Sequence, residues 1–363
     1  MEIKREKVRA GLVGLNFGKL IIEEQIFNKP GSEFIELTSI CDQDIELCEH
    51  LAKQYGVTAY YDLDELLEDD SIQAVILITG PSGRADLIRK IIRSGKDVMT
   101  TKPFEIDPVA AASVLEEARS LNRIIYLNSP SATNSRDFQI INRWREDYDL
   151  GMPVAGHHEC WYKSIEDADG SWYDDPVRCP AAPILRLGIY GLNDMLKVFG
   201  EPESIQVMQT RLFTGRPTPD MARLSIKFKS GAIADTLDGW TISPERQSTS
   251  LTLYFENGTI YRNPTMMPCD PVRASIHDHT YLCLCTADND DGMPVETIRL
   301  PNVELSQAYQ WNVFHQAVTT RIRPIDETPD SVIVNSLRVI ASLKEASETG
   351  GTVYLDPPLF RAS

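Results

Sequence analysis

The chain has 363 residues, of which 42% are hydrophobic and 25% are charged, and its formal net charge is −17. A chain of this length has room for two domains, each with a buried core of its own. The acidic balance disfavours nucleic acid as a partner, because phosphate backbones need clustered Lys and Arg, and the sequence lacks the long apolar run of a membrane span.

The first residues and the cysteines bear on where the protein works. The opening segment MEIKREKVRAGLVG is charged and lacks the apolar core of a secretory signal, which favours a cytoplasmic protein. The seven cysteines are odd in number and include no CxxC pair. We therefore expect reduced thiols, buried where Cys41 and Cys283 stand in apolar runs, and neither disulfides nor a zinc site.

Apolar strand-like runs alternate with amphipathic helical runs through the first third of the chain. Strands that are apolar throughout are typical of a parallel sheet with helices on both faces, and right-handed crossovers then give a doubly wound Rossmann fold. We assign residues 1–127 to this domain. The expected strands are Val8–Leu15, Phe34–Asp42, Gln73–Thr79, Asp97–Thr101 and Arg123–Asn128, and the expected helices are Lys19–Phe27, Ile45–Gly56, Ala85–Lys96 and Pro108–Asn122.

The pattern changes after Asn128, where strands begin to dominate. Arg223–Trp240 and Leu251–Arg262 alternate around turn signals, and Asn257-Gly258 in the second stretch is typical of a β-hairpin. We assign residues 128–363 to an α+β domain for substrate binding and oligomerisation, with a large open, mainly antiparallel sheet. Its other expected elements are helices at Asp137–Tyr148 and Ile184–Gly200, a strand at Val154–Lys163, an aromatic-rich loop at Ser164–Pro183, and closing helices within about 306–349 that pack back toward the Rossmann domain.

A glycine turn follows the first expected strand. In Gly14-Leu15-Asn16-Phe17-Gly18, a tight turn would let backbone N–H groups approach a pyrophosphate at a helix N-terminus. The match to GxGxxG is imperfect, since Asn16 stands where a glycine is usual and the spacing is one residue shorter. Asn tolerates left-handed backbone geometry, so such a turn stays feasible.

The second expected strand ends at Asp42. A carboxylate at this place accepts hydrogen bonds from the ribose hydroxyls and repels a 2′-phosphate, which favours NAD(H) and leaves NADP(H) possible. The spacing from Gly14 is longer than usual, and the loop Asn28–Glu33 accounts for the excess. The alternative is that Asp42 merely ends a strand.

The segment Thr101-Lys102-Pro103 brings the sequence to motifs of a known family. The chain resembles the Gfo/Idh/MocA oxidoreductases, which include glucose–fructose oxidoreductase and inositol dehydrogenases. The resemblance covers nearly the whole chain in order, including GLNFG, ICDQDIE, YYDLDELLED, VILITGPSGRADLIRKIIRSGKDVMTTKPF and LRLGIYGLNDMLKVFGEPE. It implies a nicotinamide-dependent oxidoreductase, a cis peptide bond at Lys102-Pro103, and homodimers or homotetramers that pack through the C-terminal sheet.

The resemblance also implies roles for single residues. Lys102 is the catalytic lysine, and Tyr190 occupies the acid–base position that is His or Tyr in the family. Four positions depart from the family pattern: Thr101 replaces glutamate, Arg84 a frequent histidine, Arg186 an aspartate and Asn193 an acidic or polar residue. The residues expected at the cofactor are Gly14, Asn16, Phe17, Gly18, Asp42, Thr79, Pro81, Arg84, Lys102, Pro103 and Asn128.

Oxidation of a secondary alcohol removes a hydride and a proton. Nicotinamide takes the hydride, so the protein must take the proton and hold the carbon near the nicotinamide ring. Lys102 directly follows a strand, at the sheet edge where such groups converge, and Tyr190 passes a proton if Lys102 or Arg186 lowers its pKa. From the residues alone, Lys102 also fits a surface lysine and Tyr190 a core tyrosine.

Arg186 and Asn193 lie near Tyr190 on the same expected helix. Arg186 fits either a bidentate site for a substrate carboxylate, which would make the substrate an acidic sugar, or a structural pair with a nearby aspartate. Asn193 fits either a hydrogen bond to a substrate hydroxyl or a polar helix face. The aspartates available for the structural pair are Asp174, Asp175 and Asp194.

Aromatic and histidine side chains complete the candidate substrate site. Trp161 and Trp172 fit rings that stack on sugar faces, or equally the packing of a long loop. His157 either points into a cleft or forms a structural hydrogen bond. His277 and His279 alternate without a third ligand pattern, so we expect no metal.

Three functional hypotheses follow from these residues. The first is an NAD(H)-dependent oxidoreductase that acts on a hydroxyl or carbonyl carbon of a sugar, polyol, sugar acid or glycoside. The second is a non-catalytic nucleotide- and sugar-binding sensor on the same fold, motivated by Arg186. The third is a reductase for a conjugated or imine carbonyl, which rests on analogy of fold alone.

Overall fold

The computed structural model describes residues 6–128, 134–163, 168, 170–212, 214–241, 248–263, 279–289, 292–301, 309–324 and 329–357. The chain forms two compact units. The first consists of residues 1–133 and 307–327, and the second of residues 134–306 and 328–363. The main boundary between the units thus lies after residue 133, whereas the sequence analysis placed it after residue 127. The first unit also includes residues 307–327, from late in the chain.

A parallel sheet forms the centre of the first unit. Among the described residues its strands run in the order β3-β2-β1-β4-β5-β6, and every neighbouring pair is parallel. This order, which reverses between β1 and β4, is that of a doubly wound Rossmann fold, so the predicted fold class is confirmed. The strands are β1 (Val8–Val13), β2 (Ile35–Cys41), β3 (Thr58–Tyr60), β4 (Ala74–Leu77), β5 (Asp97–Thr101) and β6 (Ile125–Asn128).

Three helices of the first unit begin at side-chain caps. Asp44, Asp62 and Asp107 each accept a hydrogen bond from an N–H of the helix that follows, which satisfies donors that the helix itself leaves unpaired. β4 and β5 are buried along their whole length between these helices, which explains their unbroken apolar runs. The helices are α1 (Leu15–Ile21) with a π turn at Ile22–Ile26, α2 (Ile45–Tyr55), α3 (Leu63–Leu67), α4 (Arg84–Arg93) and α5 (Pro108–Ser120), and a 3-10 turn spans Pro30–Glu33.

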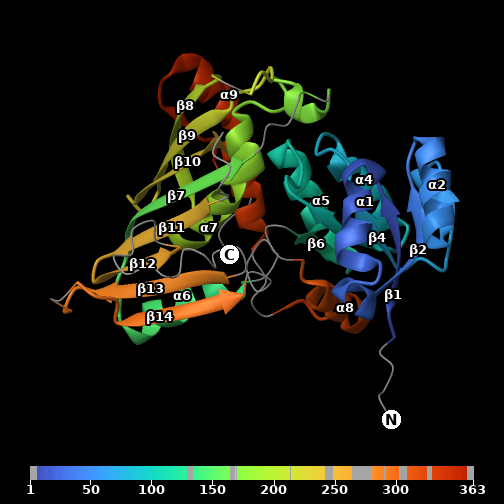
Figure 1. Ribbon diagram of the computed structural model, residues 1–363, viewed down its shortest axis with the longest axis horizontal. Helices are drawn as coiled ribbons and strands as arrows, with labels where there is room; N and C mark the ends of the chain where they lie inside the picture. Colours follow the sequence, from blue (N-terminus) through green and yellow to red (C-terminus); the bar gives the residue numbers. More distant parts are fainter. Residues whose placement is uncertain are drawn as a thin grey trace, which may run out of the picture. The chain divides into compact units, whose positions relative to one another are not determined.

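The two closing helices belong to different units. In α8 (Trp311–Thr320), Trp311 and Phe314 join the core of the first unit, and Arg321 at its end pairs with buried Asp97 at 2.6 Å. Figure 1 shows α8, in orange-red, beside the blue β1. α9 (Asp330–Thr349) packs against β8 and α7 in the second unit. This differs from the expectation that both helices return to the Rossmann domain.

A mixed sheet forms the second unit. Among the described residues its strands run in the order β14-β13-β12-β11-β7-β10-β9-β8-β15, and only β7 and β10 pair in parallel. The hairpin that Asn257-Gly258 predicts is present between β11 and β12, but its two turn residues are Glu256 and Asn257, because Gly258 already pairs with Phe255. The strands are β7 (Pro153–Lys163), β8 (Pro202–Thr210), β9 (Met221–Phe228), β10 (Ile233–Thr241), β11 (Ser248–Phe255), β12 (Gly258–Arg262), β13 (His279–Thr286), β14 (Glu296–Pro301) and β15 (Val353–Tyr354).

Helices α6 (Arg136–Asp147), α7 (Ile189–Phe199) and α9 cover one face of this sheet, and a π turn at Ile184–Gly188 leads into α7. The helix α7 lies directly on β7. A Cβ at Gly191 would stand 2.1 Å from Cγ of His158, and one at Gly156 would stand 2.7 Å from the Phe199 ring. The covered face of β7 is therefore the face of Gly156 and His158.

Cys41 and Cys283 are buried thiols, as the sequence predicts. Burial raises the pKa of Cys41 to about 12. None of the helices in the described ranges is both long and apolar enough to pass through a membrane. His277 and Cys269 lie outside the described residues.

Candidate active site

The glycine turn lies between β1 and α1. Gly14 precedes the helix with a φ of 92°, and a Cβ there would stand 2.7 Å from the carbonyl oxygen of Ile78. Gly18 lies inside the helix, where a Cβ would stand 2.6 Å from Cδ2 of Leu12 on β1. Gly14 thus makes the turn and Gly18 permits close packing of helix and strand, which are two of the roles that glycines have in dinucleotide-binding turns.

Asn16 and Phe17 occupy the first turn of α1. The helix begins at Leu15, earlier than the expected Lys19, so Asn16 is helical and does not use the left-handed geometry that Asn tolerates. Gly14 alone supplies the reversal of chain direction. Both side chains are exposed, and Phe17 keeps 50% of its surface accessible.

Asp42 directly follows β2 and reaches the glycine turn. Its Oδ2 accepts a hydrogen bond from the N–H of Leu15 at 2.6 Å, and its Oδ1 accepts one from the N–H of Asp44 at 3.0 Å. The carboxylate therefore lies at the positive end of α1, where negative charge is favoured. Each oxygen has a second lone pair, so Asp42 can still accept hydrogen bonds from ribose hydroxyls.

Two buried polar atoms that have no hydrogen-bond partner within the described ranges lie at the same edge of the sheet. They are Oγ1 of Thr79, just after β4, and Nδ2 of Asn128, the last residue of β6. Strand β5, which ends just before Lys102, runs between these two strands. Because buried polar atoms almost always find partners, this pair fits a ligand with hydrogen-bonding groups, as a dinucleotide has. Pro81, which follows in the same loop, is buried.

Lys102 stands at the carboxyl end of β5. Its side chain is half-buried, and the Lys102-Pro103 peptide bond is cis, which confirms what the family resemblance implied. The residues expected at the cofactor therefore come from the carboxyl ends of β1, β2, β4, β5 and β6, the edge at which doubly wound sheets bind their ligands.

Arg84, the first residue of α4, is a buried clamp on the Lys102 loop. Only 1% of its surface is exposed. Its Nη1 donates to the carbonyl oxygens of Thr101 at 2.6 Å, Phe104 at 3.4 Å and Pro103, and its Nη2 donates to the carbonyl oxygen of Thr79. The structure thus places the guanidinium on backbone carbonyls of two neighbouring loops.

Glu105 is a second buried group of this loop, which the sequence did not single out. Its Oε2 accepts a hydrogen bond from the N–H of Ala85 at 2.7 Å, and its Oε1 accepts from the N–H of Gly83 at 3.2 Å and of Ile106 at 2.8 Å. The carboxylate caps the N-terminus of α4. Its place next to the Lys-Pro-Phe segment is the one signal that could have identified it.

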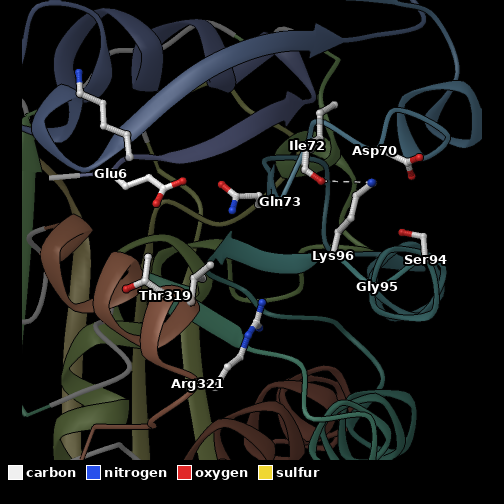
Figure 2. Close-up of a pocket in the computed structure, with 11 residues that line it drawn as sticks. Glu6, Asp70, Ile72, Gln73, Ser94, Gly95, Lys96, Thr319 and Arg321 are labelled. Atoms are coloured by element: carbon white, nitrogen blue, oxygen red, sulfur yellow. Dashed lines mark hydrogen bonds between the residues drawn. The ribbon is translucent and has the colours of Figure 1, made fainter.

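A cavity of about 500 Å³ lies at the opposite edge of the first unit's sheet. Figure 2 shows its lining, which comes from the segments before β1, β4 and β5 and from the end of α8. Lys96 donates to the carbonyl oxygens of Asp69 at 2.9 Å and Ile72 at 3.2 Å, and burial lowers the pKa of Lys96. Because these are the amino ends of the strands, the cavity is distinct from the dinucleotide edge.

Tyr190 and Asn193 lie on α7 in the second unit. Tyr190 is half-buried in the first turn, after the π turn. Nδ2 of Asn193 donates to the carbonyl oxygen of Ile189 at 2.7 Å and contacts Oγ of Ser336 on α9 at 3.4 Å. The side chain of Asn193, for which we considered a substrate hydroxyl or a polar helix face, thus links two helices inside the unit.

Arg186 lies between two aromatic rings. Its guanidinium carbon is 4.4 Å from the centroid of Tyr173 and 5.1 Å from that of Trp240, and the ring of Trp172 packs on that of Tyr173 in a tilted arrangement, with centroids 3.9 Å apart. Such contacts hold the plane of a guanidinium. Of the aspartates considered as its partners, Asp194 pairs with Arg262 at 2.7 Å and Asp175 with Arg178 at 3.4 Å.

His157 and Trp161 lie on the other face of the sheet. Side chains alternate along a strand, so these residues point away from the face of His158 that α7 covers. Nδ1 of His157 lies 3.1 Å from Oδ1 of Asp235, and this hydrogen bond raises the pKa of His157. The structure therefore does not bring His157 and Trp161 together with Tyr190 and Arg186.

A buried polar chain beneath α7 was missed by the sequence reasoning. Nδ1 of His158 lies 2.8 Å from Oγ1 of Thr236, which donates to Oδ2 of Asp238 at 2.6 Å. Burial raises the pKa of Asp238. Because side chains alternate along a strand, His157 and His158 are expected to point to opposite faces of β7. Only the packing of α7 on this strand shows that His158 is the buried one.

Comparisons with known proteins agree with this geometry. Residues 8–129 match the family described as "Oxidoreductase family, NAD-binding Rossmann fold". The chain is 28% identical over 152 residues to "Uncharacterized oxidoreductase C115.03" of Schizosaccharomyces pombe, an alignment that spans 41% of this chain and 40% of that protein. It is 23% identical over 331 residues to "D-xylose 1-dehydrogenase (NADP(+)) 2" of Haloferax volcanii, which covers 88% and 92% of the two chains.

A solved structure extends the likeness of fold to both units. The aldose-aldose oxidoreductase of Caulobacter crescentus, crystallised with glycerol, superposes with a TM-score of 0.70 at 17% identity and covers 96% of this chain and all of that one.

In the part of the chain that the structure describes, no group of three or more His, Cys, Asp or Glu side chains is arranged to hold a metal.

Proposed function

Because the chain belongs to the Gfo/Idh/MocA family of oxidoreductases, we propose that it transfers a hydride between a nicotinamide cofactor and a carbon of a carbohydrate. The reacting carbon carries a hydroxyl in one direction and a carbonyl in the other. The substrate classes are sugars, polyols, sugar acids and glycosides. The relatives named for xylose and aldoses support this class of substrate.

One observation carries the proposal. Lys102 directly follows β5, which runs between β4 and β6. At the ends of the neighbouring strands lie the buried atoms Thr79 Oγ1 and Asn128 Nδ2, which have no hydrogen-bond partner among the described residues. A glycine turn that leaves no room for a Cβ opens at the same edge. This arrangement suits a dinucleotide on the sheet edge with Lys102 beside its reactive end.

The proposed chemistry divides one oxidation between two side chains. Bound nicotinamide supplies the acceptor for the hydride. The ammonium of Lys102 holds the substrate oxygen, and Tyr190, acting as the phenolate, accepts the hydroxyl proton and afterwards loses it to solvent. The alcohol thus loses a hydride to oxidised cofactor and a proton to the protein, and the reverse steps reduce a carbonyl.

We assign NAD(H) as the favoured cofactor. Asp42 stands at the end of β2 as an anion bound to the glycine turn, and such a carboxylate repels a 2′-phosphate. The D-xylose dehydrogenase relative is named for NADP(+), so both cofactors belong in any assay.

Arg186 makes an acidic sugar the first substrate to compare with neutral ones. Its guanidinium plane is held between Tyr173 and Trp240, and a fixed guanidinium suits bidentate recognition of a carboxylate. Trp172, which stacks on Tyr173, extends this aromatic surface and fits the face of a sugar ring.

A cofactor-reduction screen tests the proposal. D-Glucuronate, D-glucose, D-xylose and myo-inositol are each offered with NAD⁺ and with NADP⁺, and the absorbance of the reduced nicotinamide is followed. We expect turnover with at least one of them, faster with NAD⁺. Tight dinucleotide binding without turnover of any sugar or polyol would favour the sensor hypothesis, and a preference for neutral sugars would remove the role of Arg186.

The variant Lys102→Ala addresses the proposed catalytic step. We expect turnover to fall by about 10²-fold or more, since a positioned proton-transfer group contributes about 10²–10⁴-fold, while NADH still binds. NADH fluorescence and steady-state kinetics measure the two effects. The matched control is Lys90→Ala, which removes an exposed lysine paired with Asp64 at 2.8 Å. Undiminished turnover of Lys102→Ala would reject this role.

A further inference from the structure

Arg84 and Glu105 connect α4 and the Lys102 loop in both directions. Arg84 belongs to the helix and donates to carbonyl oxygens of the loop, whereas Glu105 belongs to the loop and accepts from N–H groups at the start of the helix. Each side chain is only 1% exposed. Two buried charges are therefore used to join one loop to one helix end, and both bind backbone groups.

The carbonyl partners of Arg84 flank Lys102. Nη1 binds the carbonyl oxygen of Thr101, directly before Lys102, and that of Pro103, directly after it. Fixing these two peptide groups fixes the direction in which the side chain of Lys102 leaves the backbone. A lysine carries its ammonium at the end of a long flexible stem, so a small rotation of the backbone would displace the ammonium by much more.

The choice of residue types supports this interpretation. A guanidinium presents five N–H donors in a rigid fork and so can bind several carbonyl oxygens at once, whereas an ammonium is a compact point charge. Glu105 receives three backbone N–H groups, two of them at the positive end of α4. General packing needs neither charge, because apolar side chains would fill the same space at lower desolvation cost.

We propose that Arg84 and Glu105 are positioning residues for Lys102. They hold the backbone on both sides of Lys102 so that its ammonium keeps one place at the carboxyl edge of the sheet. This inference rests on the proposed function, in which Lys102 binds the reacting hydroxyl. It goes beyond that function by adding two groups that act through Lys102 without touching substrate.

The test compares Arg84→Lys and Glu105→Gln with a matched control. Arg84→Lys keeps the charge and removes the fork, and Glu105→Gln keeps the size and removes the charge. The control is Arg93→Lys on the same helix, where Arg93 is 62% exposed and pairs with Glu117 at 2.6 Å. Each variant is made in the parent and in the Lys102→Ala background, and kcat, KM and the Kd for NADH are measured with a substrate from the screen.

A misplaced reactive group costs up to about 10²-fold in rate, so we expect kcat to fall about 10- to 100-fold in Arg84→Lys and Glu105→Gln. KM and the Kd for NADH should stay within about 3-fold, and no further loss should appear in the Lys102→Ala background. A purely structural role predicts equal losses in both backgrounds, which would overturn the inference, as would kcat values equal to those of Arg93→Lys. If Arg84→Lys does not fold, Glu105→Gln decides alone.

A second readout needs no substrate. Trace labelling with acetic anhydride, followed by mass spectrometry, reports the reactivity of the Lys102 amine relative to the exposed Lys90. We expect this ratio to change in Arg84→Lys and Glu105→Gln and to stay constant in Arg93→Lys; a constant ratio in all three would overturn the inference. If Lys102→Ala turns over substrate like the parent, the proposed function fails. The labelling ratio then still tests separately whether Arg84 and Glu105 position the Lys102 amine.

Discussion

At the scale of single residues, four charged side chains of the first unit, three of them buried, bind backbone groups. Arg84 and Lys96 donate to carbonyl oxygens, and Asp42 and Glu105 accept from N–H groups. Hydrogen bonds of this kind to charged groups are stronger than neutral ones. Such a side chain fixes the loop or helix end to which it is bound, which suits a sheet edge that must keep its shape around a ligand.

Asp42→Asn tests the ribose-binding role of Asp42. Loss of the charge should weaken NADH binding about 10-fold, since a hydrogen bond to a charged group contributes about 1.5–3 kcal/mol. NADPH binding should weaken less, because the repulsion of its 2′-phosphate is lost at the same time. Fluorescence titrations with both cofactors measure the ratio. Asp44→Asn, which changes the exposed cap of α2, is the control, and an unchanged ratio in Asp42→Asn would contradict the assignment.

Asp235→Asn tests the histidine on the outer face of the sheet. The hydrogen bond that His157 donates to Asp235 raises the pKa of His157, so the protonated histidine stabilises the folded state. This contribution is full below the unfolded pKa of about 6.5 and is lost as the pH rises through the folded pKa. We expect the NMR titration of His157 to move to lower pH in the variant. We also expect the stability lost relative to the parent to be greater near pH 5.5 than near pH 9; an equal loss at both would contradict this.

At the scale of elements, two helices lie close to the strands beneath them because glycines leave room. Gly18 lets α1 approach Leu12 on β1, and Gly191 lets α7 approach His158 on β7. Gly188, in the π turn before α7, does the same beside Asp238. The helix that carries Tyr190 is thus placed by contact between its backbone and a buried polar chain. Its position depends on residues from two strands, β7 and β10.

Gly191→Ala tests this placement. The added Cβ would stand 2.1 Å from Cγ of His158, whose ring is held by Thr236, so the helix or the ring must move. Overpacking of this kind costs about 1–3 kcal/mol, and the melting temperature should fall accordingly. Gly351→Ala is the control, because its Cβ would find no atom closer than 3.8 Å. Equal melting temperatures for the two variants would show that α7 does not depend on this contact.

At the scale of the whole molecule, the second unit has a sheet with two different faces. Helices α6, α7 and α9 contact the face of His158, and the face of His157 carries the exposed side chains Met208, Ile233 and Tyr254. Their exposed fractions are 77%, 60% and 43%. Large exposed apolar side chains on one face favour association, so we assign this face to the proposed homodimer or homotetramer.

Ile233→Glu tests the assembly. In a symmetric interface, the carboxylate introduced in one copy either meets the same carboxylate of the other copy or is buried without a partner. The variant should therefore be monomeric. Size-exclusion chromatography with light scattering measures the mass. Val109→Glu, at the 59% exposed start of α5 in the first unit, should keep the mass of the parent. An oligomeric Ile233→Glu of unchanged mass would exclude this face.

The sequence by itself determined the doubly wound fold class of the first unit, the hairpin at Asn257-Gly258 and the place of Lys102 just after a strand. These features depend on apolar periodicity and turn chemistry, which act between residues close in the chain. It did not reveal the strands β8 and β14, whose apolar residues are interrupted by polar ones.

Only the tertiary structure decided what the polar side chains do. Asn193 meets Ser336, a residue 143 positions away, and His157 and His158 differ only in which face of β7 a distant helix covers. Arg84 stands at a position where a cofactor contact is expected, and the fold gives it carbonyl oxygens of the Lys102 loop as partners. A buried charge takes the partners that folding brings to it, and those partners lie too far along the chain for local sequence patterns to identify.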